Sequence, residues 1–304
     1  AYERMKGASP GSLPDSGLKA IFREIVSATH ALVKPNLIAY LGPPATFAHM
    51  ACMSAFGSSA NLKPVGSIAQ VFQEVERGEA NYGVVPVENS TEGTVTYTVD
   101  MLVDSGLTIC GEILLQISQN LLSQASGKGE IKKVYSHPQG LAQCRLWLEN
   151  NLRGMELKEV ESTAGAAELA SLEPDAAAVA SEAAASIYGL HILEPDIQDN
   201  FNNFTRFFTI GDHQASPTGR DKTSILFSVK HESGALAKAL AILANHGLSL
   251  SQIESRPSKK KAWEYIFFVD FEGHRQQEKV SRALEELESA CLFVKVLGSY
   301  PRSE

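Results

Sequence analysis

Apolar residues between positions 37 and 210 alternate between short continuous runs and stripes at helical spacing. The continuous runs predict strands buried on both faces, at 37–41, 82–87, 131–135, 176–180 and 207–210. The stripes predict helices, at 46–56, 67–77, 141–151 and 162–171, with another alanine-rich helix after the strand at 176–180. This alternation indicates an α/β domain in which helices cover the sheet.

A further amphipathic helix is predicted before the first strand. Apolar residues follow helical spacing from Leu18 to Leu32, after a turn and cap at residues 12–15, and Pro35 ends the helix. One amphipathic helix cannot bury its own apolar stripe, so we expect it to dock on another surface.

A smaller domain is predicted beyond a polar linker at 213–221. Its strands are predicted at 223–229, 248–253, 263–271 and 293–297. Helices after the first and third strands give the order β-α-β-β-α-β, which is ferredoxin-like. The run Lys259-Lys260-Lys261 is interpreted as a solvated turn. The predicted domains are an N-terminal helix at 1–36, an α/β domain at 37–213 and the small domain at 222–300.

Composition narrows the class of partner. The 304 residues carry a formal net charge of −8, which argues against nucleic acid or an anionic membrane as the main partner. Four cysteines are scattered without a CxxC pair or histidines at metal spacing, so we expect no zinc site or disulfide framework and a reducing compartment, the cytoplasm. No apolar run is long enough to span a bilayer.

The segment 203–211 places a hydroxyl and a guanidinium at the start of an apolar strand. Because successive strand residues face opposite sides, Thr205 and Arg206 should point to opposite faces of the sheet. A buried arginine needs an anion. Arg206 could meet a surface carboxylate at a sheet edge, hold a substrate carboxylate, or order the strand from its other face, which the alternation favours.

Polar residues also follow the strand at 82–87. Glu88, Asn89 and Ser90 stand where strands of α/β folds deliver polar loops to a ligand. The alternative is a helix cap by Asn89 or Ser90, with Glu92 in support. Capping is likewise the alternative at two other strand-to-helix junctions, which carry Ser136 and Thr163.

Together these segments resemble prephenate dehydratases, from Leu37 to Tyr300. Thr205-Arg206-Phe207 is similar to the family's Thr-Arg-Phe triplet, and residues 86–93 are similar to its Pro-Ile/Val-Glu-Asn-Ser-x-x-Gly loop. Residues 136–139 are similar to its Ser-His-Pro-Gln segment. The small domain resembles an ACT regulatory domain with the family's phenylalanine-sensing motifs, which are Gly234-Ala235-Leu236 and Glu254-Ser255-Arg256-Pro257.

The resemblance implies a fold and a reaction. The expected fold is a two-lobed α/β catalytic domain with a cleft, similar to periplasmic binding proteins, joined to a ferredoxin-like ACT domain. The implied reaction is the decarboxylating dehydration of prephenate to phenylpyruvate in phenylalanine biosynthesis, inhibited by L-phenylalanine. It implies no metal and no organic cofactor, and we expect a homodimer or homotetramer.

The resemblance also implies residue roles. Thr205 would be the proton donor, but a threonine hydroxyl is a poor acid. Glu88 could be a better acid behind it if burial raises its pKa, and Arg206 is the third expected catalytic residue. Expected substrate contacts are Asn89, Ser90, Thr46, Ser136, Gln143, Thr163 and Phe207. Expected phenylalanine contacts are Gly234, Ala235, Leu236, Glu254, Ser255, Arg256 and Pro257.

Two departures from the family pattern stand out. Residues 42–47 read Gly-Pro-Pro-Ala-Thr-Phe where the family has Gly-Pro-Glu-Gly-Thr-Phe, and Pro44 removes an amide donor. Gln119 stands where a histidine is often found, which weakens any role for an imidazole there.

Two other functions stay open. An arogenate dehydratase would act on a substrate with an amino group in its side chain. A non-catalytic sensor of small acids or amino acids is possible because two-lobed α/β folds also serve as solute-binding proteins. The N-terminal helix resembles the last of the three helices of a chorismate mutase domain, so we expect no mutase site in this chain.

Overall fold

The structure is a computed structural model that describes residues 2–8, 11, 13–33, 35–257 and 265–303. The chain forms two compact units. The first comprises Ala1–Val71, Asn89–Glu92 and Leu115–Thr205, and the second comprises Phe72–Glu88, Gly93–Leu114 and Arg206–Glu304. Among the described residues, no helix combines the length and apolarity that a bilayer crossing requires.

One sheet of the first unit has the strand order β10-β6-β9-β7-β8. Its strands are β6 (Asn120–Ser123), β7 (Lys133–Ser136), β8 (Glu156–Glu159), β9 (Ala176–Ala180) and β10 (His191–Glu194). Its helices are α6 (Pro138–Gln143), α7 (Arg145–Asn151), α8 (Thr163–Leu172) and α9 (Glu182–Tyr188). The predicted helix at 141–151 is therefore two helices, which meet at Cys144.

The small residues of β9 let helices cover both faces of this sheet. Ala176 and Ala178 pack in one core cluster with α8 and α9. Ala177 and Val179 pack in another cluster with Leu148 of α7. Every residue of β9 is buried, which confirms the prediction of a strand that is covered on both faces.

A second sheet has the order β2-β1-β3-β11-β5, with β4 paired to β3. Its strands are β1 (Leu37–Leu41), β2 (Asn61–Val65), β3 (Tyr82–Asn89), β4 (Gly93–Thr94), β5 (Thr108–Gln116) and β11 (Phe204–Gly211). The helices α3 (Phe47–Phe56), α4 (Ile68–Glu76) and α5 (Thr96–Asp104) follow β1, β2 and β4 in the chain. The α/β part thus contains two separate sheets, as a two-lobed domain requires.

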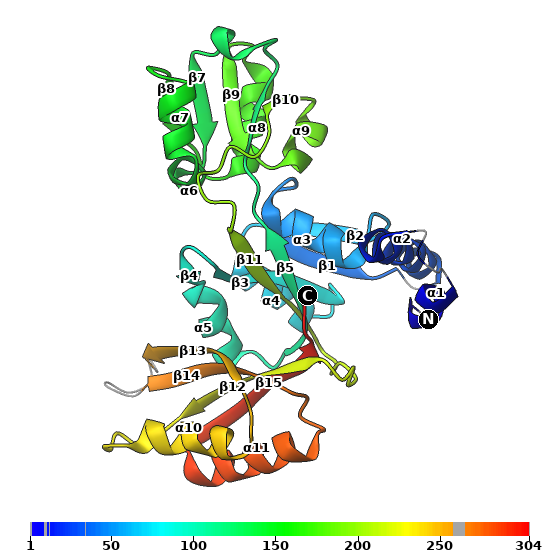
Figure 1. The fold of residues 1–304 in the computed structure, drawn as a ribbon, viewed down its shortest axis with the longest axis vertical. Coiled ribbons are helices and arrows are strands. Elements are labelled where there is room, and N and C mark those ends of the chain that lie inside the picture. The colour runs from blue at the N-terminus through cyan, green and yellow to red at the C-terminus, as the bar shows by residue number, and fades with distance from the viewer. Residues whose placement is uncertain (1, 9–10, 12, 34, 258–264, 304) are drawn as a thin grey trace. The chain divides into compact units, whose positions relative to one another are not determined.

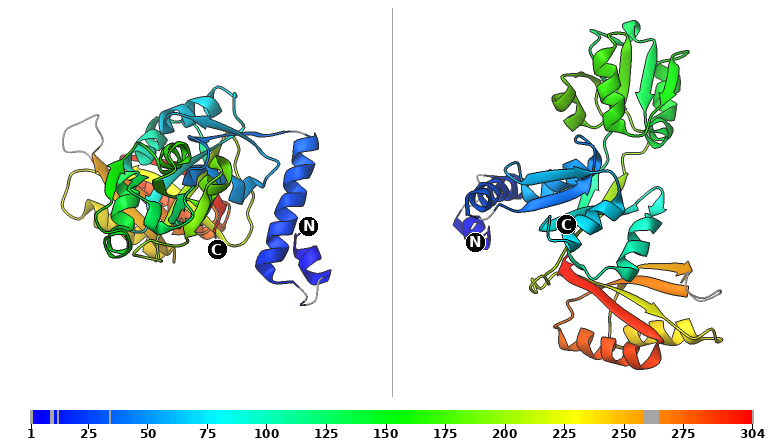
Figure 2. Two further views of the ribbon diagram at one scale, coloured as in Figure 1. Left: turned by 90° about the horizontal axis from the view of Figure 1, so that it is seen from above. Right: turned by 180° about the vertical axis from the view of Figure 1, so that it is seen from behind.

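The predicted N-terminal helix is α2 (Asp15–Val33), which lies beside the short α1 (Tyr2–Ala8) in Figure 2. It docks on the end of α3, as expected, but mainly through polar side chains. The Glu24 carboxylate accepts hydrogen bonds from the backbone N–H and hydroxyl of Ser58 at 2.9 and 2.6 Å. Ile21 and Ile25 of its apolar stripe are about half exposed.

The small domain has the predicted β-α-β-β-α-β order and lies in the second unit. Its elements are β12 (Asp221–Ser228), α10 (Ala235–Asn245), β13 (Leu250–Pro257), β14 (Tyr265–Glu272), α11 (Glu278–Ala290) and β15 (Phe293–Pro301). The antiparallel sheet has the order β13-β14-β12-β15, and both helices cover one of its faces (Figure 1). The predicted lysine turn at 259–261 lies outside the described residues.

Alternation along β14 gives the two faces of this sheet different partners. Val269 and Phe271 pack against α10 and α11. Phe268 and Asp270 point to the opposite face, where the ring of Phe268 lies 6.3 Å from the ring of Phe208 in β11. The small domain therefore has one apolar core under its helices and a second, mixed contact with β11.

Gly298 of β15 makes the closest backbone approach of this second contact. A Cβ atom at this position would lie 2.2 Å from the Ile109 carbonyl oxygen in β5. Backbone atoms cannot swing aside as a flexible side chain can, so the two strands could not keep their spacing with any larger residue.

We predict that Gly298→Ala lowers the free energy of unfolding by about 3 kcal/mol, at the upper end of overpacking costs. Urea denaturation followed by circular dichroism measures the change. Gly106→Ala is the matched control, because a Cβ there meets nothing within 4 Å. Equal stability of the two variants would contradict the close approach.

Candidate active site and a buried arginine network

Thr205 is held by a side chain from the polar loop that follows β3. Asn89 Nδ2 donates a hydrogen bond to Thr205 Oγ1 at 2.9 Å, and it also contacts Asn203 Oδ1 at 2.8 Å. Asn89 is buried, whereas Thr205 is half-buried. Because the amide occupies a lone pair of the Thr205 oxygen, the hydroxyl proton is directed elsewhere and is available for donation.

The Asn89 loop is fixed by its own side chains. Asn89 Oδ1 accepts hydrogen bonds from the backbone N–H and the hydroxyl of Thr91 at 3.0 and 2.5 Å. Ser90 Oγ donates to the Asn202 carbonyl and accepts from the Phe204 N–H. The capping alternative for this loop is wrong, because β3 continues to Asn89 and α5 begins only at Thr96.

Three other expected substrate contacts differ in how deeply they are buried. Ser136 is fully buried and donates to the Val179 carbonyl at 2.7 Å, so its hydroxyl is already engaged. Phe207 is buried in the core. Thr163 is the half-buried first residue of α8, whose N-cap is Ser162.

The loop between β1 and α3 ends at a helix cap, Thr46. Its hydroxyl accepts from the His49 N–H at 3.4 Å and donates to the Pro43 carbonyl at 3.0 Å. Ala45 is buried with a φ of 71°, at the position where the family has glycine. Its carbonyl accepts a hydrogen bond from Ser181 Oγ at 2.8 Å.

Gln143 has a partner that sequence reasoning did not assign. Gln119 Nε2 donates to Gln143 Oε1 at 3.1 Å, which leaves the Gln143 amide N–H groups for other acceptors. Gln119 is buried, and its Oε1 has no hydrogen-bond partner within the part of the chain that the structure describes. The one sequence feature that pointed to this contact was Gln119 itself, which stands where the family often has a histidine.

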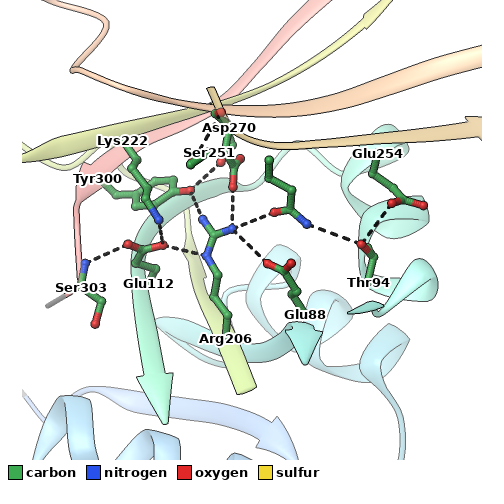
Figure 3. Close-up of polar contacts among 12 residues, drawn as sticks. Glu88, Thr94, Glu112, Arg206, Lys222, Ser251, Glu254, Asp270, Tyr300 and Ser303 are labelled. Atoms are coloured by element: carbon green, nitrogen blue, oxygen red, sulfur yellow. Dashed lines mark hydrogen bonds and ion pairs between the residues drawn. The ribbon is translucent and has the colours of Figure 1, made fainter. Parts of the chain in front are cut away.

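Alternation along β11 places Arg206 on the opposite face of the strand from Thr205, and their different partners agree with this. The Arg206 guanidinium is enclosed by protein groups (Figure 3). Nε donates to Glu112 Oε2 at 2.7 Å, and Nη1 donates to Asp270 Oδ2 at 2.6 Å. Nη2 donates to the Tyr300 hydroxyl at 3.0 Å. All three guanidinium nitrogens are therefore engaged by the protein, which supports the strand-ordering alternative over a substrate contact.

Burial and charge pairing together shape this network. Burial disfavours the charged form of Arg206, but the facing groups, Asp270 first among them, raise its pKa above the ordinary value. Burial raises the pKa of Asp270, and the Arg206 guanidinium opposes that rise. Glu112 also pairs with Lys222 at 3.1 Å, so two cations balance two buried carboxylates.

Glu88 belongs to the Arg206 side of the sheet. Its carboxylate lies 3.9 Å from Arg206 Nη1, and burial raises its pKa while Arg206 lowers it. Asn89, the next residue of the same strand, is the one that contacts Thr205. The structure therefore does not bring Glu88 to Thr205, since successive strand residues face opposite sides.

The second motif of expected phenylalanine contacts, residues 254–257, lies against the segment that follows the Asn89 loop. Thr94 Oγ1 donates to Glu254 Oε2 at 3.3 Å, and Arg256 lies 3.4 Å from the Asp100 carboxylate of α5. Ser255 and Pro257 are exposed. Lys295 of β15 donates to three carbonyls at the end of α5, where a cation is favoured.

The first motif begins α10. Gly234 is the N-cap residue with a φ of 79°, a left-handed conformation that glycine adopts without strain. Ala235 and Leu236 form the first turn and are half-buried. No group of three or more histidine, cysteine, aspartate or glutamate side chains in the described residues is arranged to hold a metal ion.

Two family models match consecutive parts of the chain. The family model described as prephenate dehydratase matches residues 38–215, and the ACT domain model matches residues 223–289. A bifunctional chorismate mutase/prephenate dehydratase from Aquifex aeolicus is 54% identical, over 96% of this chain and 81% of its own length.

Two solved structures are similar over 88% of this chain. A prephenate dehydratase from Arthrobacter aurescens in complex with L-Phe is 34% identical over 90% of its length, with a TM-score of 0.81. A structure described as a novel type of quorum quenching acylase is 32% identical over 98% of its length, with a TM-score of 0.80. The family model alone matches more than half of the chain, and the chain therefore belongs to the prephenate dehydratase family and carries an ACT domain.

Proposed function

We propose that the chain converts prephenate to phenylpyruvate with the Thr205 hydroxyl as hydrogen-bond donor to the leaving group. The reaction breaks the bond to the ring carboxylate, which leaves as carbon dioxide, and its electron pair expels the ring hydroxyl as water. The hydroxyl needs a proton as it leaves. The observation that carries the proposal is the bond from Asn89 Nδ2 to Thr205 Oγ1, which orients the threonine proton away from Asn89.

Asn89 also addresses the weakness of threonine as an acid. A threonine that passes its proton to the leaving hydroxyl develops negative charge on Oγ1. An amide donor placed 2.9 Å from that oxygen stabilises this charge without reorganisation. Asn89 is thus a supporting residue rather than a substrate contact, and the proton is restored to Thr205 from solvent or through the substrate site.

Three of the expected contacts remain suited to the substrate carboxylates and keto group. Gln143 presents amide N–H groups, since its oxygen is taken by Gln119. Thr163 starts α8, where backbone N–H groups and the helix dipole favour an anion. Thr46 completes the proposed set. In this proposal Arg206 and Glu88 belong to the buried arginine network and do not contact the reacting atoms of the substrate.

Regulation by phenylalanine is proposed at the ACT domain, which we place at 222–300, with the catalytic domain at 37–213. The L-Phe complex of the Arthrobacter relative supports this proposal. The edge strand β13 carries the second sensing motif, and its Ile253 is 45% exposed. We propose that a second copy of the chain covers this edge in a homodimer or homotetramer. Four free cysteines support a cytoplasmic location.

Thr205→Ala should lower kcat for prephenate by about 10²–10⁴-fold, with little change in KM, because a transition-state donor is lost. Thr205→Ser keeps the hydroxyl and should keep most of the activity. Phenylpyruvate formation is the readout, and arogenate is assayed in parallel to decide between the two dehydratases. Alanine activity within a few-fold of wild type would refute the assignment.

Asn89→Asp should lower kcat by about 10²–10³-fold, as expected when an oxyanion donor is lost. The carboxylate would accept the Thr205 proton and so reverse the direction of the hydrogen bond. Asn202→Asp is the matched control, because it adds the same charge three residues before Thr205 on an exposed side chain. The supporting role fails if both variants lose the same activity.

Gly234→Leu should abolish inhibition by phenylalanine while leaving uninhibited turnover within about twofold of wild type. A leucine side chain would occupy the space through which a ligand reaches the backbone at the start of α10. Gly219→Leu is the matched control, because it introduces the same left-handed strain in the linker. Both glycines have positive φ and open surroundings. Calorimetry that shows unchanged phenylalanine binding to Gly234→Leu would place the sensor elsewhere.

A further inference from the structure

The guanidinium that follows Thr205 in the chain is anchored mainly by the regulatory sheet. Asp270 of β14 and Gln252 of β13 both contact Arg206 Nη1, at 2.6 and 2.9 Å. Tyr300 of β15 contacts Nη2 at 3.0 Å. Glu112 of β5 is the one carboxylate from the catalytic side that bonds Nε. Three strands of the regulatory sheet therefore converge on a single catalytic-domain residue (Figure 3).

Asp270 and Arg206 form a buried ion pair in which each charge compensates the other. The Asp270 side chain has no solvent exposure and that of Arg206 is 9% exposed, so water cannot replace either partner. The Arg206 guanidinium also lies over the Phe208 ring, 4.8 Å from its centroid, in a cation–π contact. A buried ion pair of this kind holds its two strands at one spacing, because either ion alone would be uncompensated.

The same two strands carry the proposed donor system on their other face. Arg206 directly follows Thr205 on β11, and Glu88 directly precedes Asn89 on β3. The Arg206–Glu88 ion pair at 3.9 Å and the Asn89–Thr205 hydrogen bond at 2.9 Å thus join neighbouring positions of one strand pair. Thr205 and Arg206 share one planar peptide unit, so the backbone position of Arg206 constrains that of Thr205.

We infer that Asp270, a residue of the regulatory sheet, is a positioning residue for Thr205 that acts through Arg206. The inference rests on the proposed donor role of Thr205 and adds the route by which the regulatory domain reaches it. Asp270 pairs directly with Gln252 in the β13–β14 register, and Gln252 also contacts Thr94 at 3.5 Å. A ligand that shifts β13 at the second sensing motif therefore moves both groups that bind Arg206 Nη1.

Asp270→Asn in the full chain tests this inference. The variant keeps the shape of the side chain and removes its charge. We expect kcat for prephenate to fall by about tenfold or more with KM within about twofold, since the donor geometry and not substrate binding is disturbed. We also expect calorimetry to show phenylalanine binding near wild-type affinity, while inhibition by phenylalanine weakens by about five-fold or more.

Asp221→Asn is the matched control. Asp221 is a buried aspartate at the start of β12 in the same sheet, and its carboxylate is bonded by Thr218 and Gly219 of the linker. We expect its loss to lower the melting temperature while kcat and inhibition stay as in wild type. An Asp270→Asn enzyme with wild-type kcat and wild-type inhibition overturns the inference, as does an Asp221→Asn enzyme with the same kinetic losses.

Tyr300→Phe keeps the inference falsifiable if Asp270→Asn does not fold. It removes one bond to Arg206 and keeps the buried ring, so kcat and inhibition should both fall, but less than in Asp270→Asn. Unchanged kinetics in this variant would overturn the inference. Thr205→Ala separates the two proposals: if it stays active the donor role fails, whereas if it is inactive and the network variants are unchanged, only the positioning role fails.

Discussion

The buried guanidinium of Arg206 is the constraint on which the second unit depends. An arginine that is almost inaccessible to water must be paired, and Asp270 and Glu112 supply the two carboxylates. Glu112 in turn binds Lys222 and the backbone N–H of Ser303. The network therefore joins β5 and β11 of the catalytic part to β12, β14 and the residues after β15, and the regulatory sheet cannot shift without disturbing a charge balance.

Strand alternation gives the two faces of the β3–β11 pair different contacts. Thr205 and Asn89 meet on one face of the β3–β11 pair, and Arg206 and Glu88 meet on the other. Two adjacent residues of each strand thus have different partners, and only Arg206 and Glu88 belong to the network that includes the regulatory sheet.

Much of the fold follows from local patterns in the sequence. The predicted strands at 37–41 and 176–180 coincide with β1 and β9, and the β-α-β-β-α-β order of the small domain is confirmed. Both follow from the periods of 2 and 3.6 residues that local sequence records. The opposite orientation of Thr205 and Arg206 follows from the same period. The break in the helix at 141–151 did not, because no glycine or proline marks Cys144.

The partners of the site residues were decided by the tertiary structure alone. The Asn89–Thr205 bond spans 116 positions and the Arg206–Asp270 bond spans 64, so no local pattern relates their ends. The sequence by itself determined that Arg206 lies in an apolar strand on the opposite face from Thr205, and that it needs an anion wherever it is buried. Only the packing of the regulatory sheet against β11 decided which anion, because burial and charge pairing depend on which distant strands are neighbours and not on the order of residues along one strand.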